Sequence, residues 1–315
     1  MIAIFLSVLP VVLVLAAGYA GARTGYLPEG VSEALNGFAV RLAVPVLLFR
    51  ALYQLDLSQS FYPPMLASFY FGAVSSFALA IVLARMVWKR PPGESVAVGF
   101  CAMFSNSLML GMPIVERAFG EAALTPGFGI VALHAPVLYI VGMVTMELSR
   151  RDGRSLAATL AAALKSIFAN ALMIGILAGA ALNLSGLVVP EPAMAAVDML
   201  ATAAIPAALV GIGATLTRYR ITAELSESLI VSALALFLHP GIVLVLTHFV
   251  LGLPASYVAV AVIVAAMPPG MNVYIFATMY DRAVGLAATS VLTATTLSVV
   301  TISFWLFVIH ALLPV

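Results

Sequence analysis

Charged residues are scarce in this chain, and their scarcity excludes a soluble fold. They make up 9% of the 315 residues, against about 25% in a typical soluble domain. Hydrophobic residues make up 63%. We therefore expect membrane lipid as the main surroundings of the chain, and no nucleic-acid partner.

Cysteine is almost absent as well. Cys101 is the one cysteine and lies in an apolar run. The chain therefore cannot form an internal disulfide, and we expect no metal cluster and no cofactor. Met1 leads directly into an apolar segment that lacks the basic start and the small-residue cleavage site of a signal peptide. We interpret that segment as the first membrane span.

Long apolar segments are what the chain does contain. Ten of them reach the length of about 20 residues that a membrane span needs, and short joints rich in glycine and proline separate them. The sequence thus predicts an all-α membrane protein with ten transmembrane helices. The predicted spans are residues 2–22, 32–54, 64–88, 95–119, 125–148, 157–182, 193–217, 226–250, 256–280 and 285–311.

The basic residues alternate between the two sides of these spans. Odd-numbered joints hold ten, even-numbered joints hold only Arg117, and Lys165 lies just inside span six. Because positively charged joints stay in the cytoplasm, we expect a multi-pass protein of the cytoplasmic (inner) membrane with both termini outside. The ten are Arg23, Arg85, Lys89, Arg90, Arg150, Arg151, Arg154, Arg218, Arg220 and Arg282.

The two halves of the chain, residues 1–150 and 151–315, resemble each other. Pro28-Glu29 recurs 162 residues later as Pro190-Glu191, and Pro45 recurs 161 residues later as Pro206. Each half holds five predicted spans, an odd number, so the second half enters the membrane upside down. We expect a 5+5 inverted repeat, which brings spans four and nine together as a crossing pair.

Spans four and nine are also the two segments that contain helix breakers. Span nine includes Met267-Pro-Pro-Gly270, and two prolines remove two backbone donors. Span four includes Ser105-Asn-Ser107, followed by Gly111 and Pro113. Broken backbone at membrane depth is tolerated only where protein or a water-filled cavity satisfies the freed groups. Paired breaks of this kind point to the substrate site of a transporter.

The crossing is the predicted binding site. Asn106 and Asn272 offer amide groups, and Ser105 and Ser107 offer hydroxyls. The N-termini of the half-helices present free N–H groups and positive dipole ends, which suit a carboxylate. An alternative interpretation is that Asn106 and the serines only cap the broken helices.

Further polar residues within the spans remain open to two interpretations. Arg41 and Arg50 flank Pro45 in span two and either contact substrate or serve structure and lipid. His134 and His239 are candidate proton carriers, since histidine titrates near neutral pH, or else they are buried hydrogen-bonding residues. Gly18 and Gly21 suit close helix contact. Neither break contains an acidic residue, so a carboxylate-built cation site is not visible.

These motifs resemble the auxin efflux carrier family, within the bile/arsenite/riboflavin transporter-like superfamily. The resemblance rests on Ser105-Asn-Ser-Leu108 with Gly111-Met-Pro113, on the Pro-Pro-Gly of span nine, and on Ala43-Val-Pro45 with Leu48-Phe-Arg50. It implies a scaffold domain of spans one, two, six and seven, through which two copies dimerise. Spans three to five and eight to ten would form a transport domain that moves like an elevator.

The resemblance also implies site residues. Asn106 and Leu108 match the family's site in span four, and Met271 and Asn272 follow the span-nine glycine, Gly270. Val44 and Pro45 match scaffold residues near the span-two proline. The family's plant members have a long loop between spans five and six. Here that joint is short, about residues 149–155, as in the family's bacterial type.

We therefore predict a secondary transporter of small organic anions, such as malonate or malate. The alternatives are a sodium-coupled symporter of the bile-acid type and an auxin-like exporter of aromatic acids. The membrane potential favours anion exit by about 2.3 kcal/mol per charge per 100 mV, so accumulation would need a coupled proton or sodium ion. No His-Glu-x-x-His helix and no paired intramembrane aspartates occur in the sequence, so we expect no enzyme.

Overall fold

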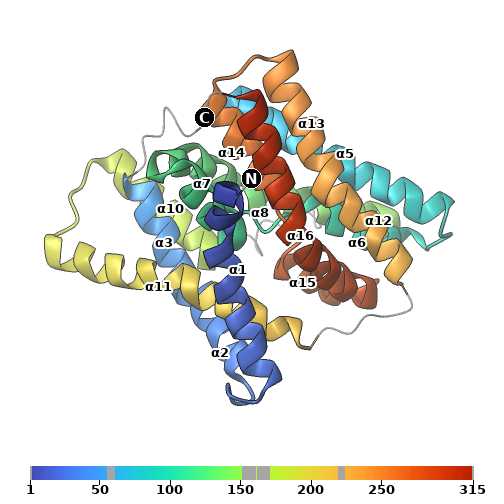
Figure 1. Ribbon diagram of the computed structural model, residues 1–315, viewed down its shortest axis with the longest axis horizontal. Helices are drawn as coiled ribbons and strands as arrows, with labels where there is room; N and C mark the ends of the chain where they lie inside the picture. The colour runs from blue at the N-terminus through green and yellow to red at the C-terminus, as the bar shows by residue number, and fades with distance from the viewer. Residues whose placement is uncertain (1, 55–60, 151–160, 162–170, 219–223, 314–315) are drawn as a thin grey trace. The chain divides into compact units, whose positions relative to one another are not determined.

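The protein is all-helical throughout the part of the chain that the computed structural model describes, which is residues 2–54, 61–150, 161, 171–218 and 224–313 (Figure 1). Within these ranges the one extended pairing is an isolated antiparallel bridge between Ser105 and Pro269. The predicted all-α fold class is confirmed. The start of predicted span six and the basic residues Arg151, Arg154, Lys165 and Arg220 lie outside the described residues.

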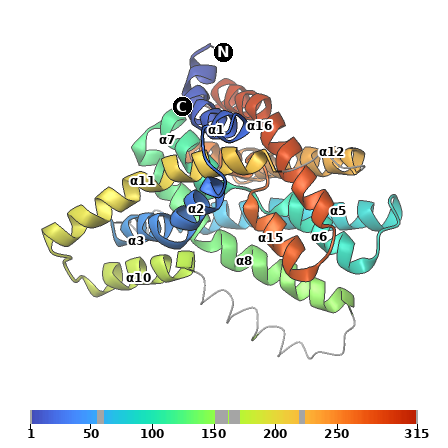
Figure 2. The same cartoon turned by 90° about the horizontal axis from the view of Figure 1, so that it is seen from below.

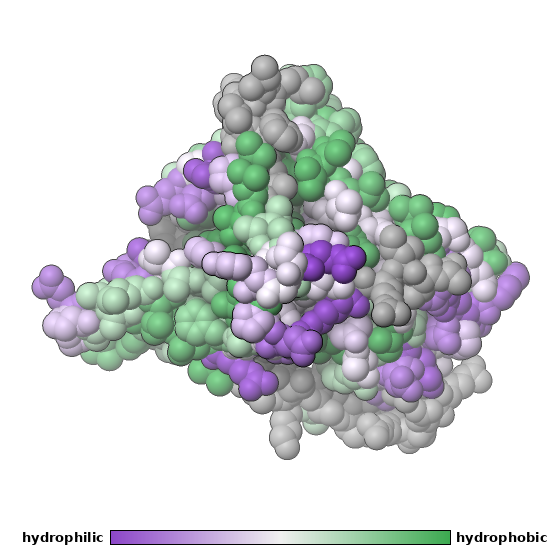
Figure 3. Space-filling view, turned by 60° about the horizontal axis from the view of Figure 1, so that its bottom comes forward, coloured by the Kyte–Doolittle hydropathy of each residue, from purple (hydrophilic) through white to green (hydrophobic). Residues whose placement is uncertain are grey.

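Among the residues that the structure describes, six helical stretches are long and apolar enough to cross a membrane. Large apolar side chains such as Phe71 and Val300 are 61% and 72% exposed, and apolar residues cover much of the surface seen in Figure 3. Lipid explains this surface and water does not, so the protein is a multi-pass membrane protein. The six stretches are Val31–Gln54, Pro63–Met86, Glu121–Ser149, Glu191–Leu216, Leu225–Val250 and Val284–Leu312.

The chain divides into two compact units, each made from separate parts of the sequence. Unit 1 comprises Met1–Val8, Phe61–Ala163 and Tyr219–Val315, and unit 2 comprises Leu9–Ser60 and Leu164–Arg218. Each unit therefore draws helices from both halves of the sequence.

Unit 2 is built on close contacts between helix backbones. Helix α3 packs against α10, and α2 packs against α11 (Figure 2). A Cβ atom added at Gly18 would lie 2.2 Å from the Val210 carbonyl oxygen, and one at Gly175 would lie 2.2 Å from that of Pro45. Only glycine permits such an approach, so the predicted close contact at Gly18 is confirmed. The elements are α1 (Ile2–Arg23), α2 (Val31–Phe38), η1 (Ala39–Ala43), α3 (Val44–Gln54), α10 (Ala171–Ser185) and α11 (Glu191–Leu216).

Unit 1 holds both interrupted segments. Helix α5 packs against α6 and α13, and α16 packs against α12 and α15. The elements are α5 (Pro63–Met86), α6 (Pro92–Met103), η2 (Ser107–Gly111), α7 (Met112–Phe119), η3 (Glu121–Ala123), α8 (Leu124–Arg150), α12 (Leu225–Ala233), η4 (Leu234–Leu238), α13 (His239–Leu244), η5 (Val245–Val250), α14 (Ala255–Ala265), α15 (Met271–Tyr280) and α16 (Val284–Leu312).

Proline explains three wide turns in these helices. The π-helical segments η1, η2 and η4 each end two residues before a proline, at Pro45, Pro113 and Pro240. Proline has no N–H and clashes with the carbonyl four residues earlier, and a π-turn widens the helix at that point. At Pro240 the carbonyl four residues earlier belongs to Leu236, which accepts a 2.7 Å hydrogen bond from Nε1 of Trp305. A donor from α16 thus replaces the missing backbone donor.

Within unit 1, two pairs of joints that are far apart in the sequence meet. Arg90, in the third joint, forms ion pairs with Glu94, Glu224 and Glu227 at 2.9, 2.8 and 2.6 Å. A Cβ atom at the nearby Gly93 would lie 3.3 Å from Nε of Arg282, in the ninth joint. The second and eighth joints instead meet each other, where the rings of Tyr62 and Tyr257 lie 4.7 Å apart.

The ion-pair cluster fixes the charge of Arg90. Burial lowers the pKa of its guanidinium, but the hydrogen bonds that it donates to the Glu227, Glu224 and Glu94 carboxylates outweigh burial and hold that pKa above its usual range. Arg90 is therefore cationic at every pH the protein meets. It joins the α5–α6 joint to the start of α12, and so connects the two halves of the sequence within unit 1.

Candidate functional site

The two interrupted segments touch each other inside unit 1. Helix α6 ends at Met103 and α14 ends at Ala265, and in both segments a non-helical stretch precedes the next helical turn. The backbone N–H of Asn106 donates a 2.8 Å hydrogen bond to the Pro268 carbonyl oxygen. The bridge between Ser105 and Pro269 adjoins this bond. Both breaks expected from the sequence are present, and they cross.

The backbone of Asn106 begins the second half-helix. Its carbonyl oxygen accepts hydrogen bonds from the N–H groups of Leu110 and Gly111, at 3.2 and 3.1 Å. The N–H groups of residues 107–109 precede this first bond, so they are the donors that a helix start leaves unpaired within the helix. On the other segment, α15 starts at Met271, and Val273 donates to the Gly270 carbonyl oxygen at 3.2 Å. Two helix N-termini, each with a positive dipole end, therefore begin at the crossing.

The side chain of Asn106 does not cap the helix that follows it. Residues 107–111 have no side-chain cap hydrogen bond, and within the described ranges the Asn106 amide has no hydrogen-bond partner. It is half-buried and lies over Gly270, where an added Cβ would sit 3.1 Å from Cγ of Asn106. The capping alternative therefore fails for this side chain, which is available to a ligand.

Asn272 is oriented by a residue that the sequence did not single out. The Tyr139 hydroxyl, from α8, donates a 3.2 Å hydrogen bond to Oδ1 of Asn272. With its oxygen engaged, the Asn272 amide presents its two N–H donors elsewhere. No motif surrounds Tyr139, so nothing in the sequence distinguishes it from the other span tyrosines.

The two serines of the first break are buried and bonded to each other. Their hydroxyl oxygens lie 2.8 Å apart, and Ser107 Oγ also lies 3.4 Å from the Ser105 carbonyl oxygen. That carbonyl accepts a 3.0 Å hydrogen bond from Nε2 of His134. The serines therefore shape the break, and His134 contacts it directly.

Aromatic rings pack together among the helices that carry the two breaks. Phe100 and Phe276, from α6 and α15, stack with centroids 3.9 Å apart. Phe104 contacts the rings of both His134 and Tyr139. His239 lies one ring farther away, since its Nε2 is 3.2 Å from the Phe69 carbonyl oxygen and its ring packs on that of Phe69. Ring packing therefore fixes the side chains that flank the two breaks.

The remaining predicted site residues of unit 1 line the same breaks. Leu108 and Met271 are both half-buried. Leu108 is the second residue of its half-helix, and Met271 is the first residue of the other. Gly111 packs against Met267, with 3.0 Å between an added Cβ and Cγ of that methionine. The crossing thus combines amide donors with apolar walls and no charged side chain.

Val44, Pro45 and Arg50 belong to unit 2. Val44 and Pro45 are buried there, and the Pro45 carbonyl packs against Gly175 of α10. Arg50 forms a charge pair with Asp198 at 2.6 Å, a partnership that spacing could not indicate. The charge of Arg50 is thus compensated within its own unit, whereas Arg41 is exposed.

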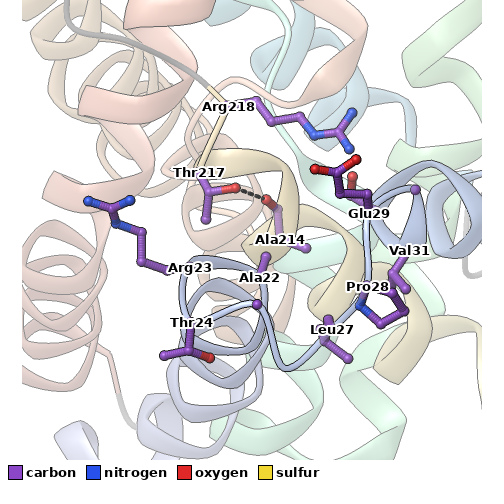
Figure 4. A pocket seen from close by; sticks show the side chains of 13 residues that line it. Ala22, Arg23, Thr24, Leu27, Pro28, Glu29, Val31, Ala214, Thr217 and Arg218 are labelled. Atoms are coloured by element: carbon purple, nitrogen blue, oxygen red, sulfur yellow. Dashed lines mark hydrogen bonds between the residues drawn. The ribbon is translucent and has the colours of Figure 1, made fainter.

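A pocket of about 740 Å³ lies in unit 2, and none of the predicted site residues is among those that line it. Figure 4 shows Arg23 at the end of α1, and Arg218 just after α11, among the residues that line it. These arginines belong to the first and seventh joints, so both joints lie at one end of unit 2. Arg218 forms an ion pair with Glu33. Across the described residues, no three His, Cys, Asp or Glu side chains gather to hold a metal.

Comparison with known proteins decides the family. A family model described as "Membrane transport protein" matches residues 3–306. The chain belongs to this family. The family expectation drawn from the motifs is thereby confirmed.

Two relatives in this membrane transport family match over almost their whole length. A protein of Rhizobium meliloti (strain 1021) named "Putative malonate transporter" is 27% identical over 311 residues, covering 96% of this chain and 95% of the relative. A protein of Methanothermobacter thermautotrophicus named "Uncharacterized transporter" is 24% identical over 314 residues, covering 95% and 96%. These are the names of transporters, in agreement with the expectation that this chain is not an enzyme.

Proposed function

We propose that this protein is a secondary transporter of small organic anions, with its binding site at the crossing of the two broken segments. The observation that carries the proposal is the unpartnered Asn106 amide beside two half-helix N-termini. Amide donors and positive dipole ends in a site without cations bind a carboxylate by hydrogen bonds.

The donors at the crossing favour a small mono- or dicarboxylate. The Asn106 amide, the Asn272 amide and the N–H groups of residues 107–109 come from two segments, so carboxylate oxygens can be held from two sides. A relative is named for malonate transport, which makes malonate the first substrate to test. The rings of Phe100 and Phe276 already stack on each other, and we propose that this packing disfavours a large aromatic acid.

Two features support the ten-span inverted repeat. Asn106 corresponds to Pro268 by the 162-residue offset of the halves, and these two residues are hydrogen-bonded to each other. Residues that correspond in two inverted halves meet where the symmetry axis passes. The joints of unit 1 also meet in two separate pairs. The basic third joint lies beside the basic ninth joint, and the second joint lies beside the eighth. A cytoplasmic basic face, with both termini outside, follows from that arrangement.

The two compact units support an elevator-type mechanism. Unit 2 groups the segments expected in a scaffold, and unit 1 groups those expected to move with the substrate. We propose that unit 1 carries the anion across the membrane and that unit 2 anchors a homodimer.

Counterflow in proteoliposomes tests the proposal. Purified protein in vesicles preloaded with malonate should accumulate radiolabelled malonate in a saturable manner. Asn106→Ala and Asn272→Ala should each raise the half-saturating concentration about tenfold, as expected for loss of a hydrogen bond to a charged group. Asn183→Ala is the matched control, since this half-buried asparagine donates to the Tyr53 carbonyl oxygen in unit 2.

The outcomes separate the alternatives. Wild-type affinity in both crossing variants would place the site elsewhere. Counterflow that requires sodium would favour the bile-acid type of symporter, and uptake that never saturates would indicate a channel.

A further inference from the structure

The contact between His134 and the first break assigns the tautomer of this histidine. Nε2 lies 3.0 Å from the Ser105 carbonyl oxygen. A carbonyl oxygen only accepts hydrogen bonds, so Nε2 carries the proton and Nδ1 of the neutral ring carries a bare lone pair. His134 thereby donates to the break with one nitrogen and offers a base with the other.

That base is enclosed and has no protein donor. His134 is 5% exposed, and Nδ1 is among the buried polar atoms without a hydrogen-bond partner in the described part of the chain. Buried polar atoms are satisfied as a rule, so such an exception requires an explanation. The rings of Phe69 and Phe104 pack edge-on against the imidazole and hold it in place.

The titratable groups around His134 leave Nδ1 as the available proton acceptor. His239, on α13, packs on the other side of Phe69 and is engaged with its carbonyl oxygen through Nε2. Tyr70 on α5 donates to the Ile130 carbonyl oxygen, and Cys101 on α6 to that of Ala97. On α8 itself, Tyr139 donates to Asn272, and Glu147 is half-buried near the end of the helix. On the helices packed against α8, Glu94 pairs with Arg90, Tyr257 lies at the start of α14, and Arg85, Glu116, Arg117 and Glu121 are exposed.

We propose that the transporter carries one proton with each anion and that Nδ1 of His134 holds this proton during transport. The inference rests on the proposed function and deepens it. The proton adds to the Nδ1 lone pair, giving an imidazolium whose Nε2–H still donates to Ser105, and it leaves from the same atom on the other side. No other bond changes.

Charge makes the two binding events interdependent. An imidazolium enclosed by Phe69 and Phe104 is unfavourable alone, and an anion at Asn106, the residue after Ser105, favours it. By linkage, the proton raises the affinity for the anion as much as the anion raises the affinity for the proton. His239 lacks the contact with the break, which makes it the matched control.

Gradient-driven uptake tests the proposal. Proteoliposomes at pH 8 inside and pH 7 outside, with equal potassium and valinomycin to clamp the voltage, receive radiolabelled malonate. The wild-type protein and His239→Gln should accumulate malonate up to about tenfold, the limit for one proton per anion across one pH unit. His134→Gln, which keeps a donor for Ser105 but cannot titrate, should show counterflow without accumulation. Accumulation by His134→Gln equal to wild type would overturn the proposal.

A second measurement does not depend on that variant. When malonate is added to the wild-type protein in weakly buffered detergent at pH 7, the protein should take up about one proton per bound anion. A pH indicator measures this uptake. No uptake of protons despite binding would overturn the coupling and leave the transport proposal intact. Absence of any counterflow would instead defeat the transport proposal.

Discussion

The backbone N–H of Asn106, in the first break, donates a 2.8 Å hydrogen bond to the carbonyl oxygen of Pro268, in the second. The bond cannot be reciprocated, because proline has no N–H. The carbonyl of Asn106 therefore turns to Leu110 and Gly111 and starts a helix instead. Because of this proline, the first break donates the backbone hydrogen bond between Asn106 and Pro268, and the second break only accepts it.

Substituting Gly270 should displace the Asn106 side chain. The Cβ of Gly270→Ala would lie 3.1 to 3.4 Å from three atoms of Asn106, closer than ordinary contact, so the amide must move. We expect the half-saturating malonate concentration to rise at least about fivefold, with thermal stability lowered by about 1 kcal/mol or less. Gly241→Ala is the control, because its nearest neighbour beyond its own helix is a Trp305 ring atom at 3.8 Å. Equal affinity in the two variants would show that the position of Asn106 does not matter.

Removing the Tyr139 hydroxyl should release Asn272. Tyr139→Phe loses one hydrogen bond to Oδ1, a contribution of about 0.5–1.5 kcal/mol, so we expect affinity for malonate to fall about three- to tenfold. Tyr19→Phe, at an exposed position on α1, provides the control. The double variant Tyr139→Phe/Asn272→Ala tests whether the two residues act through one bond. If adding Tyr139→Phe to Asn272→Ala weakens malonate binding by the same factor as Tyr139→Phe alone, the two effects are additive. Additive effects would contradict the prediction, because they exclude a shared bond.

Trp305 should stabilise the helix around Pro240. In Trp305→Phe the Leu236 carbonyl oxygen loses its donor within a buried site, which costs about 1–3 kcal/mol. We expect a lower midpoint of thermal unfolding in detergent, with no change in the half-saturating malonate concentration. Trp88→Phe, in the joint after α5, should leave the midpoint within experimental error. A Trp305→Phe protein as stable as wild type would mean that the freed carbonyl finds another donor.

Arg90 should stabilise unit 1 by the same amount at neutral and alkaline pH. Its pKa is raised in the folded protein, so its contribution is complete below the pKa of arginine in the unfolded chain, which lies far above neutral pH, and is lost only as the pH rises past the pKa of the folded state. Arg90→Gln leaves three carboxylates facing one another and should lower the unfolding midpoint equally at pH 7 and pH 9. Lys89→Gln, an exposed neighbour, should have little effect. A deficit that shrinks between pH 7 and pH 9 would contradict this account.

Local backbone chemistry explains which parts of the fold could be predicted. Pro268, Pro269 and Gly270 cannot continue a helix in any context, and the apolar segments around them can only be helices in lipid. The breaks and the helical class therefore follow from composition. The pairing of Arg50 with Asp198 and of Tyr139 with Asn272 does not, because each depends on how distant helices rotate against each other. The sequence predicts His134 as a proton carrier or a buried hydrogen-bonding residue, but it does not identify Ser105 as its partner, for the same reason.

The glycine contacts of unit 2 have a mechanical consequence. Where Gly18 meets Val210 and Gly175 meets Pro45, main chain rests on main chain with no intervening rotamers to rearrange. Two helices in contact of this kind cannot slide past each other easily, because sliding would push carbonyl oxygens into neighbouring backbone. We therefore expect unit 2 to keep its internal structure during the transport cycle.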